Sequence, residues 1–520
     1  MTQASPQTSP TGGTDDRGEV TRKHLRGSNL MLIGRLVSLG VNFLVNVLTV
    51  RYLTKEDYGA FSYALGMATA GASFLLLGMP RAVSRFAALY QEEREFGSRF
   101  GILVLSTGLV ATLGALVTGV AIFLRAELIE PFVNDSLARA LLLILIAVAP
   151  LQALDNLFQA MLAVFASPTA IFFRRFVLGP MLRLTAVLSV LLWGASVTFL
   201  AWAYLAASLV GVVIYWPMLR HALARAGLLR LFDRRALRLP WRTALGFGLP
   251  LVFADALFAV RLPVLLVLLE SQRGTKDVAD FNAFLKISGL NSVVLQSMKL
   301  LFLPVASRLF ARRDHAGLDD LYWKTTIWIA VMTFPILVPC IAMPDTMALL
   351  INGRAYVEAS PVLVALAVGE YFNAAMGLNT YTLHVYARVR FVLWTTGLAT
   401  VVGSLVGLWW IPGQGALGAA MAYSLAIVVQ NLLHHGGLHA YTEVVLFRRR
   451  YLGVYASLVV ATGLLVGLEV FLDPPVLVEV LMVAATSLGL LRLNREVMDL
   501  THVFPELRKL PWLTWLLGSR

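Results

Sequence analysis

The chain has 520 residues, of which 58% are hydrophobic and only 14% are charged. Soluble domains carry about 25% charged residues, so this composition excludes an ordinary soluble protein and indicates a polytopic membrane protein. The formal net charge of +13 does not call for a nucleic-acid partner, because basic cytoplasmic loops account for such an excess in membrane proteins. The single cysteine excludes an internal disulfide and a cysteine-based metal cluster.

Residues 1–29 are rich in Ser, Thr, Pro, Gly and charged residues, and they cannot bury enough apolar area to fold. We interpret them as a disordered cytoplasmic tail. They do not form a signal peptide, because no apolar segment with a small-residue cleavage site follows a short basic start.

About fourteen apolar segments follow, each near the roughly 20 residues that a helix needs to cross the bilayer core. Their centres lie near Phe43, Ala68, Thr112, Pro150, Met181, Ala207, Leu257, Val293, Met332, Ala374, Ala399, Ile427, Thr462 and Val483. The sequence therefore predicts an all-α membrane protein with about 14 transmembrane helices.

Lys and Arg gather in alternate connections between these segments. The basic connections hold the groups Arg22–Arg26, Arg81–Arg99, Arg174–Arg175, Arg220–Arg242, Arg308–Lys324, Arg388–Arg390 and Arg448–Arg450, and the tail from Arg492 onward is also basic. The positive-inside rule places the basic side of the membrane protein, including both termini, in the cytoplasm. We expect the protein to lie in the cytoplasmic (inner) membrane.

An internal repeat appears when the sequence is shifted by about 220 to 224 residues. The stretch from Tyr58 to Phe61 then lies over that from Val278 to Phe281, and PRAVSRF lies over PVASRLF. Because six helices are an even number, two six-helix repeats are related by an axis along the membrane normal. The predicted parts are an N-terminal lobe at 30–217, a basic cytoplasmic linker at 218–243, a C-terminal lobe at 244–445, two additional transmembrane helices at 446–492 and a cytoplasmic tail at 493–520.

A polar stripe runs along the first apolar segment. Arg35, Ser38, Asn42, Asn46 and Thr49 fall within an arc of about 80° on one face of a helix. Lipid does not solvate such groups cheaply, so the stripe must face other helices or a water-filled cavity. Packing between helices and lining of a cavity both remain open.

Other charged residues also lie within predicted spans. The basic ones, besides Arg35, are Arg183, Arg261, Lys286 and Lys299, and the acidic ones are Asp155, Asp255 and Glu370. Each requires a partner or water, and an excess of cations suits an anionic substrate. Structural ion pairs, such as Asp155 or Asp255 with an arginine, are the alternative interpretation. His434, His435 and His439 lack nearby carboxylates, so we expect no metal site there.

The run NVLTVRYLTKEDYGAFSYALGMATAGASFLLLGMPRAVSRF resembles the opening of polysaccharide-biosynthesis flippases. Their superfamily also contains multidrug and toxin extruders and lipid II flippases. The resemblance covers about the first 90 residues through the Arg-containing turn, Tyr58 with Gly59, Phe61 and the pair Gly78 and Pro80. It implies a two-lobed transporter, not an enzyme, that moves undecaprenyl-diphosphate-linked glycans to the outer leaflet by alternating access.

With that substrate, an O-antigen or exopolysaccharide precursor, we expect a cationic binding cavity lined by Arg35, Asn42, Asn46, Arg183, Arg261, Lys286 and Lys299. Asp155, Asp255 and Glu370 are candidates for coupling to an H⁺ or Na⁺ gradient, and no ATP-binding loop or other cofactor motif occurs. Membrane lipids and the polysaccharide polymerase machinery are the expected partners.

Three alternatives to this function remain. A multidrug antiporter of the same fold and a lipid II flippase are the close ones. A membrane glycosyltransferase or polymerase is more distant, because the external connections are short.

Overall fold

A computed structural model of the chain describes residues 34–35, 37–131, 133–165, 172–229, 237–472 and 474–498. The predicted tail at 1–29 lies outside these residues, as does most of the predicted tail at 493–520. Every regular element within the described ranges is a helix, and no strand occurs among them. The predicted all-α fold class is confirmed.

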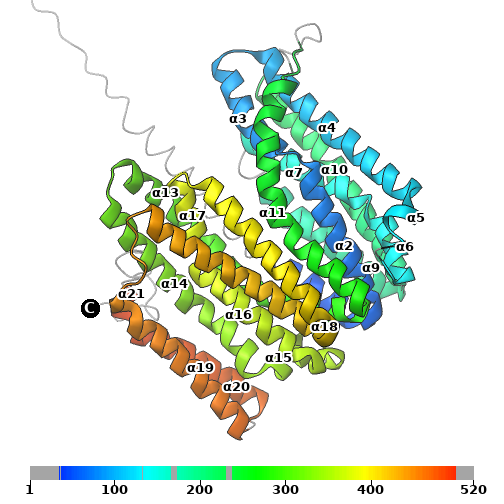
Figure 1. Ribbon diagram of the computed structural model, residues 1–520. Coiled ribbons are helices and arrows are strands. Elements are labelled where there is room, and N and C mark those ends of the chain that lie inside the picture. The colour runs from blue at the N-terminus through cyan, green and yellow to red at the C-terminus, as the bar shows by residue number, and fades with distance from the viewer. Residues whose placement is uncertain are drawn as a thin grey trace, which may run out of the picture. The chain divides into compact units, whose positions relative to one another are not determined.

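Further helices follow the first described one, Val37–Tyr52, and Figure 1 labels most of them. These are α2 (Lys55–Leu75), α3 (Met79–Glu92), α4 (Phe96–Phe123), α5 (Arg125–Leu128), α6 (Ser136–Leu145), α7 (Val148–Phe165), η1 (Phe173–Leu178), α9 (Gly179–Trp193), α10 (Val197–Arg225) and α11 (Trp241–Arg273). The later elements are α12 (Thr275–Ser288), α13 (Asn291–Ala311), α14 (His315–Ala342), α15 (Pro344–Ile351), η2 (Arg354–Ala359), α16 (Ser360–Met376), α17 (Leu378–Val385), α18 (Val389–Tyr441), η3 (Arg449–Tyr451), α19 (Leu452–Leu472), α20 (Val476–Leu493) and α21 (Arg495–Met498).

Eleven helical stretches among the described residues are long and apolar enough to cross a membrane. Each predicted span centre lies inside a described helix. α18 holds two of them, Ala399 and Ile427, because it consists of two helices joined at Gly415, whose φ of 55° and ψ of −129° are not helical. The chain is therefore a multi-pass membrane protein.

Several helix starts follow from local sequence. At the start of α6 the carboxylate of Asp135 accepts a hydrogen bond from the backbone N–H of Ala138 at 2.7 Å. Asp314 accepts in the same way from Gly317 at 2.8 Å at the start of α14. Such caps satisfy backbone donors that have no partner within the helix.

Contacts divide the chain into two compact units. Unit 1 consists of Met1–Leu48, Gly71–Gly119 and Ala147–Val252, and unit 2 consists of Thr49–Ala70, Val120–Ile146 and Phe253–Arg520. Two segments of the predicted N-terminal lobe, 49–70 and 120–146, thus belong to the same unit as the C-terminal helices. The predicted lobe boundaries do not coincide with these units and stay a prediction. The predicted linker at 218–243 begins inside α10.

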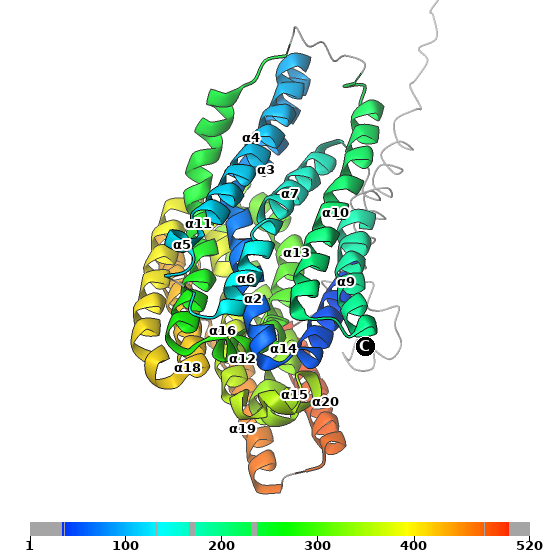
Figure 2. The ribbon, with the colours of Figure 1, turned by 90° about the vertical axis from the view of Figure 1, so that its right-hand side faces the viewer.

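In unit 1, α7 packs against α3 and α10, and α10 also contacts α9. Figure 2 shows α7, α9 and α10 running side by side. The buried side chains between them include Leu157 and Met161 on α7 and Tyr215 on α10. The ring of Tyr215 meets that of Phe158 edge-on, with centroids 5.9 Å apart. This packing holds the polar groups of α7 against η1 and α10.

In unit 2, α14 lies in the hydrophobic core. It contacts α13, α16, α19 and α20, and it buries Trp323, Trp328 and Phe334 in one continuous apolar cluster. α16 and α18 are in close contact at Gly369, where a β-carbon would overlap the side chain of Ser424. Small residues at such points let membrane helices pack backbone to backbone.

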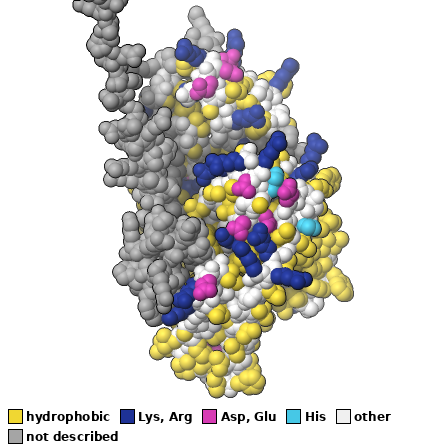
Figure 3. All heavy atoms as spheres, turned by 90° about the vertical axis from the view of Figure 1, so that its left-hand side faces the viewer, with side chains coloured by type: hydrophobic (Ala, Val, Ile, Leu, Met, Phe, Trp, Pro, Cys, Tyr) yellow, Lys and Arg dark blue, Asp and Glu magenta, His cyan; other side chains and the backbone are white. Residues whose placement is uncertain are grey.

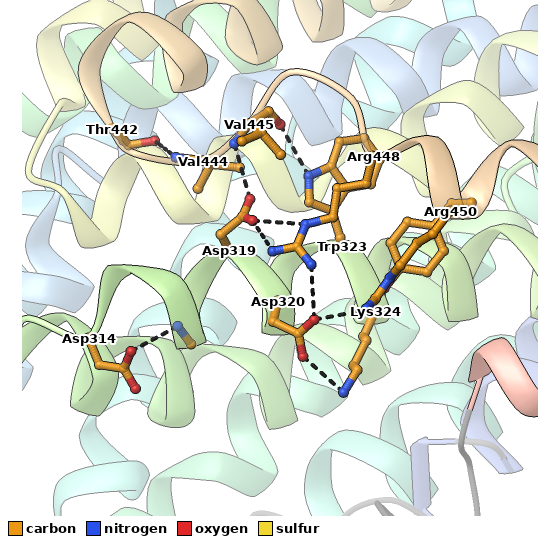
Figure 4. Close-up of polar contacts among 12 residues, drawn as sticks. Asp314, Asp319, Asp320, Trp323, Lys324, Thr442, Val444, Val445, Arg448 and Arg450 are labelled. Atoms are coloured by element: carbon orange, nitrogen blue, oxygen red, sulfur yellow. Dashed lines mark hydrogen bonds and ion pairs between the residues drawn. The ribbon is translucent and has the colours of Figure 1, made fainter.

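A charged cluster fixes the connection between α18 and α19 to α14 (Figure 4). Arg448 donates to Asp319 from Nε at 2.9 Å and to Asp320 from Nη1 at 3.2 Å, and Arg450 donates to Asp320 at 3.0 Å. Asp319 also accepts from the backbone N–H of Val445 at 3.1 Å. The carboxylates therefore bind both side chains and backbone of the turn that leads into the last pair of spans.

The surface of α19 and α20 is strongly apolar. Val459, Phe471 and Leu477 are 71%, 87% and 72% exposed. On the face shown in Figure 3, acidic and basic side chains lie in the upper and middle parts, and the lower end is almost wholly hydrophobic. In a membrane protein such side chains face lipid, which also explains why apolar exposure here does not mark a docking site.

Candidate functional site

The polar stripe of the first helix contacts another helix within unit 1. Asn42 donates to the backbone oxygen of Ser38 at 2.7 Å and to its hydroxyl at 3.2 Å. The carbonyl oxygen of the Asn42 side chain accepts from Nη1 of Arg183 on α9 at 3.4 Å. A β-carbon at Gly34 would overlap the ring of Phe172, so the start of this helix lies directly on the segment before α9. Asn42 therefore faces α9, and whether the stripe also lines a cavity stays a prediction.

Asp155 on α7 forms an ion pair with Arg174. It also accepts a hydrogen bond from Gln159 at 3.0 Å. The guanidinium of Arg174 lies over the ring of Tyr215, 4.1 Å from its centroid, and a β-carbon at Gly211 would come 2.8 Å from its Nη2. Arg174 is only 5% exposed, because the carboxylate and the ring draw it into the helix packing, and its placement on the cytoplasmic side of the membrane stays a prediction.

The local backbone explains how Arg174 and Arg175 differ. They lie in η1, a π-helical turn that precedes α9, and π-turns shift the register of the side chains that follow. Arg174 is buried, whereas Arg175 is exposed and lies within electrostatic range of the half-buried Arg35. Arg183 lies within electrostatic range of Asp155, which already pairs with Arg174. Arginines thus outnumber carboxylates in this part of unit 1.

In unit 2, the cation of Arg261 is held by neutral groups. Arg261 on α11 is half-buried, and it donates to the hydroxyl of Thr400 at 3.4 Å and to the side-chain oxygen of Gln430. Glu370 lies within electrostatic range of Arg261 but accepts its hydrogen bond from the hydroxyl of Tyr423 at 2.9 Å. Among the described residues, the ion pairs within 4.0 Å do not include Arg261. Its positive charge is therefore retained.

A chain of amide and hydroxyl groups joins α16, α17 and α18. The Asn431 side chain donates to Asn373 at 3.4 Å, and Asn379 donates to the Asn431 backbone oxygen at 2.9 Å. Thr380 donates to Asn379 at 3.2 Å and lies 2.8 Å from Nδ1 of His434. Polar side chains of α16 and α17 therefore bind α18 together, although α16 ends at Met376 and α17 begins at Leu378.

Sequence reasoning missed Tyr423 and Asn431, which bind α16 and α17 from α18, and Gln430, which binds Arg261. It considered His434 only as a possible metal ligand. A signal was present, because polar residues recur in an otherwise apolar segment at the spacing of one helix face: seven residues separate Tyr423 from Gln430, and four separate Gln430 from His434.

The other predicted site residues whose side chains the structure describes are half-buried or exposed. Lys299 is half-buried with its ammonium 4.3 Å from the ring centroid of Tyr381, and Lys286 is exposed. Asn46 is half-buried on the first helix. Asp255 falls within α11, but its side chain lies outside what the structure describes. The structure does not place the residues of unit 1 relative to those of unit 2, so the joint cavity stays a prediction.

The three histidines on α18 lie among aromatic and backbone groups. The ring of His435 is 6.4 Å from that of Tyr322 and 5.9 Å from that of Trp323, and its Nε2 lies 2.7 Å from the backbone oxygen of Leu446. Across the described ranges, no group of three or more His, Cys, Asp or Glu residues is placed to hold a metal ion.

Solved structures show which known fold this helical arrangement matches. A multidrug resistance MATE family transporter of the MOP superfamily, in an inward-facing conformation, gives a TM-score of 0.64 at 18% identity over 79% of this chain and 98% of that one. The lipid II flippase MurJ, in an inward closed conformation, gives 0.72 at 13% identity over 90% and 99%. A MOP superfamily transporter from Pyrococcus furiosus gives 0.53 at 18% identity over 80% and 94%. These likenesses show the fold of a MOP-type transporter.

Comparison of sequences identifies the family. No curated protein sequence matches this chain. The sequence model of the family described as polysaccharide biosynthesis protein matches residues 24–310. That match covers more than half of the chain, includes the polar stripe of the first helix and the Asp155–Arg174 pair, and agrees with the fold. The chain therefore belongs to the polysaccharide biosynthesis protein family and is a multi-pass membrane protein with the fold of MOP-type transporters.

Proposed function

We propose that this protein moves a polyprenyl-diphosphate-linked oligosaccharide, an O-antigen or exopolysaccharide precursor, across the cytoplasmic membrane by alternating access. Membership of a polysaccharide biosynthesis family supports a glycan substrate. Likeness in fold to a lipid II flippase supports a substrate carried on a lipid. The activity is transport and includes no chemical step on the glycan.

The observation that carries this proposal is the way in which the embedded arginines are held. Arg174 is neutralised by Asp155. Arg183 and Arg261 instead contact neutral groups: an asparagine for the first, and a threonine and a glutamine for the second. A cation kept inside a membrane protein without a paired carboxylate is costly, so it indicates function. Its charge stays available for an anion, and a guanidinium fork fits diphosphate oxygens well.

Coupling to an ion gradient is the next part of the proposal. Glu370 is the favoured carboxylate, because it is buried at 6% exposure and is bonded to a tyrosine rather than to a cation. Asp155 is less favoured, since it is already paired with Arg174, and Asp255 remains a candidate from sequence. H⁺ and Na⁺ both remain possible coupling ions.

The distribution of basic residues supports an orientation with both termini in the cytoplasm. Membrane lipids and the polymerase that extends the translocated glycan are the proposed partners. We propose no nucleic-acid partner.

A multidrug antiporter is the second candidate function, because MATE transporters share this fold. Such a protein would bind cationic drugs, and the arginines described here disfavour cations. A lipid II flippase differs from the proposed function only in the glycan.

Mass spectrometry of lipids that copurify with the protein tests the proposal. We expect the wild type to retain a polyprenyl-diphosphate glycan whose mass names the pathway. Charge-assisted hydrogen bonds contribute about 1.5–3 kcal/mol each, so Arg35→Ala and Arg261→Ala should each retain about tenfold less lipid. Arg273→Ala, which removes an exposed arginine paired with Asp277, is the matched control and should retain the wild-type amount.

A wild type that carries only bulk phospholipid and confers efflux of cationic dyes, dependent on Asp155 or Glu370, would replace the proposed function by the antiporter.

A further inference from the structure

Two arginines at the start of α18 have no carboxylate partner within the part of the chain that the structure describes. Arg388 is the residue before the helix and Arg390 lies in its first turn, and both side chains are exposed. The ion pairs within 4.0 Å among the described residues include neither of them. Glu443, which follows the end of α18, is exposed as well and forms no such pair.

The arginines of the neighbouring connection are held differently. Arg448 and Arg450 follow the other end of α18, and Asp319 and Asp320 on α14 pair with them. The positive-inside rule depends on Lys and Arg and is almost indifferent to Asp and Glu, so either arrangement orients a membrane protein equally well. Orientation alone therefore does not explain why the arginines at the start of α18 lack acidic partners.

Aromatic packing fixes the position of Arg388. Its guanidinium lies over the ring of Tyr441, 4.9 Å from the centroid. The Tyr441 ring meets that of Phe391 edge-on, with centroids 5.1 Å apart. A β-carbon at Gly437 would overlap the Phe391 ring, so the two ends of α18 lie against each other here. Because the N–H donors of a guanidinium lie in its plane, a group stacked on a ring can still present them to an anion.

An exposed apolar stripe begins one turn beyond Arg390. Trp394 is 81% exposed, and the residues that continue its face of the helix at intervals of three or four are also exposed: Leu398, Val401 and Leu405. From residue 390 to residue 405 a helix rises about 22 Å, which exceeds the roughly 15 Å of one leaflet of the bilayer core. The stripe is therefore long enough to line an acyl chain, with Arg390 at its polar end.

Trp394 marks the level at which lipid headgroups lie. Tryptophan is enriched at the interface between membrane and water, and Arg390 lies one helical turn further from the bilayer centre. The expected topology places this end of α18 at the cytoplasmic leaflet, where anionic phospholipids gather. A guanidinium fork fits the oxygens of a phosphate group.

We propose that Arg388 and Arg390, with Tyr441 beside them, bind the phosphate of an anionic phospholipid of the cytoplasmic leaflet, and that an acyl chain of this lipid lies along the stripe headed by Trp394. A headgroup such as that of phosphatidylglycerol keeps the phosphate charge for the arginines. In a zwitterionic headgroup, the ammonium group competes for the same phosphate. The inference goes beyond the proposed function, since this lipid is a resident of the protein and not its transported substrate.

Competition between two phospholipids tests the site. The protein is placed in nanodiscs that contain phosphatidylglycerol and phosphatidylcholine with the same acyl chains, and native mass spectrometry counts the lipids that stay bound after release into detergent. We expect the wild type to retain phosphatidylglycerol in preference. Arg388→Gln and Arg390→Gln should each lower that retention about tenfold, because each removes a charge-assisted hydrogen bond.

Arg450→Gln is the matched control. It also removes one positive charge near an end of α18, but that arginine is already paired with Asp320, so retention should equal that of the wild type. If all three variants lose phosphatidylglycerol to the same extent, binding follows the net charge of the surface and the site is refuted. Equal retention of the two phospholipids by the wild type refutes it as well.

Photo-cross-linking in membranes identifies the occupant. Benzoylphenylalanine in place of Trp394 should form adducts with phosphatidylglycerol, and Arg390→Gln in the same chain should lower the share of that lipid among the adducts. The same photoreactive residue in place of Leu477, which is exposed on α20, should react with bulk lipid whether or not Arg390 is changed. Adducts at position 394 with a polyprenyl-diphosphate lipid would assign Arg390 to the transported substrate and overturn the proposal.

Discussion

Replacing Asp155 by asparagine tests whether this carboxylate is a structural partner or a coupling site. The carboxylate pairs with Arg174, whose side chain is 6% exposed, while the Asp155 side chain is 25% exposed. Asparagine keeps the shape and one acceptor but removes the negative charge. Arg174 would then be a shielded cation supported only by the ring of Tyr215 and by hydrogen bonds.

The expected cost follows from that geometry. Breaking a buried ion pair by removing one partner costs about 3–5 kcal/mol. Partial exposure of Asp155 and the retained contact with Tyr215, worth about 2 kcal/mol when desolvated, place this case at the low end, near about 3 kcal/mol. Arg174→Met in the same chain removes the uncompensated charge and should recover most of the loss.

The assay is the free energy of unfolding of the wild type, both single variants and the double variant in mixed micelles, followed by tryptophan fluorescence. A coupling energy of about 2–3 kcal/mol is expected for residues in direct contact. Two outcomes refute the reasoning. One is a double variant that loses the sum of the single losses. The other is an Asp155→Asn variant of wild-type stability that no longer transports, because this would assign Asp155 to ion coupling.

Three further predictions concern packing. Arg448→Gln breaks two carboxylate contacts on α14 and should cost about 3 kcal/mol, seen as faster proteolysis of the turn before α19. Gly415→Ala places a β-carbon on a backbone with φ of 55° and should lower stability by about 1–3 kcal/mol. Gly413→Ala, with open space around it, should lower the free energy of unfolding by less than half as much, measured by the same fluorescence assay. Gly369→Leu should force α16 and α18 apart and lower the yield of monodisperse protein, whereas Gly463→Leu, which faces open space, should not.

The fold was largely predictable because membrane spans leave a strong signal. Lipid requires about 20 apolar residues per helix, so all predicted span centres fall inside helices. Two spans centred near Ala399 and Ile427 were predicted, but the position of the break between them was not, since glycine is common in membrane helices and does not by itself indicate the non-helical backbone seen at Gly415. Nor was the division into units, because it depends on contacts such as Arg51 with the end of α15 that no periodicity reveals.

The polar groups were harder to assign than the spans. The period of a helix places Asn42 on one face, and Arg183 of another helix contacts it there. Period alone does not say which partner a charge finds. Arg174 lies within a π-helical turn, which changes the register of side chains, and its position next to Arg175 suggested a loop. The amides of α18, Gln430 and Asn431, were missed as partners of Arg261 and Asn373, because single amides in an apolar segment are read as packing unless their spacing is examined.

The two ways of holding an arginine have different consequences for function. Arg174 with Asp155 forms a nearly neutral unit, so an anion passing nearby gains little from it, and removing both charges should leave transport intact. Arg261 is costlier to keep, because threonine and glutamine satisfy its donors without cancelling its charge. A protein under selection for stability alone would have replaced it with an apolar residue, since that change is often neutral or stabilising. The presence of Arg261 beside Glu370 is explained if an anionic group binds to Arg261 at some stage of the transport cycle. The charge of the Glu370 carboxylate would then determine the affinity for that anion.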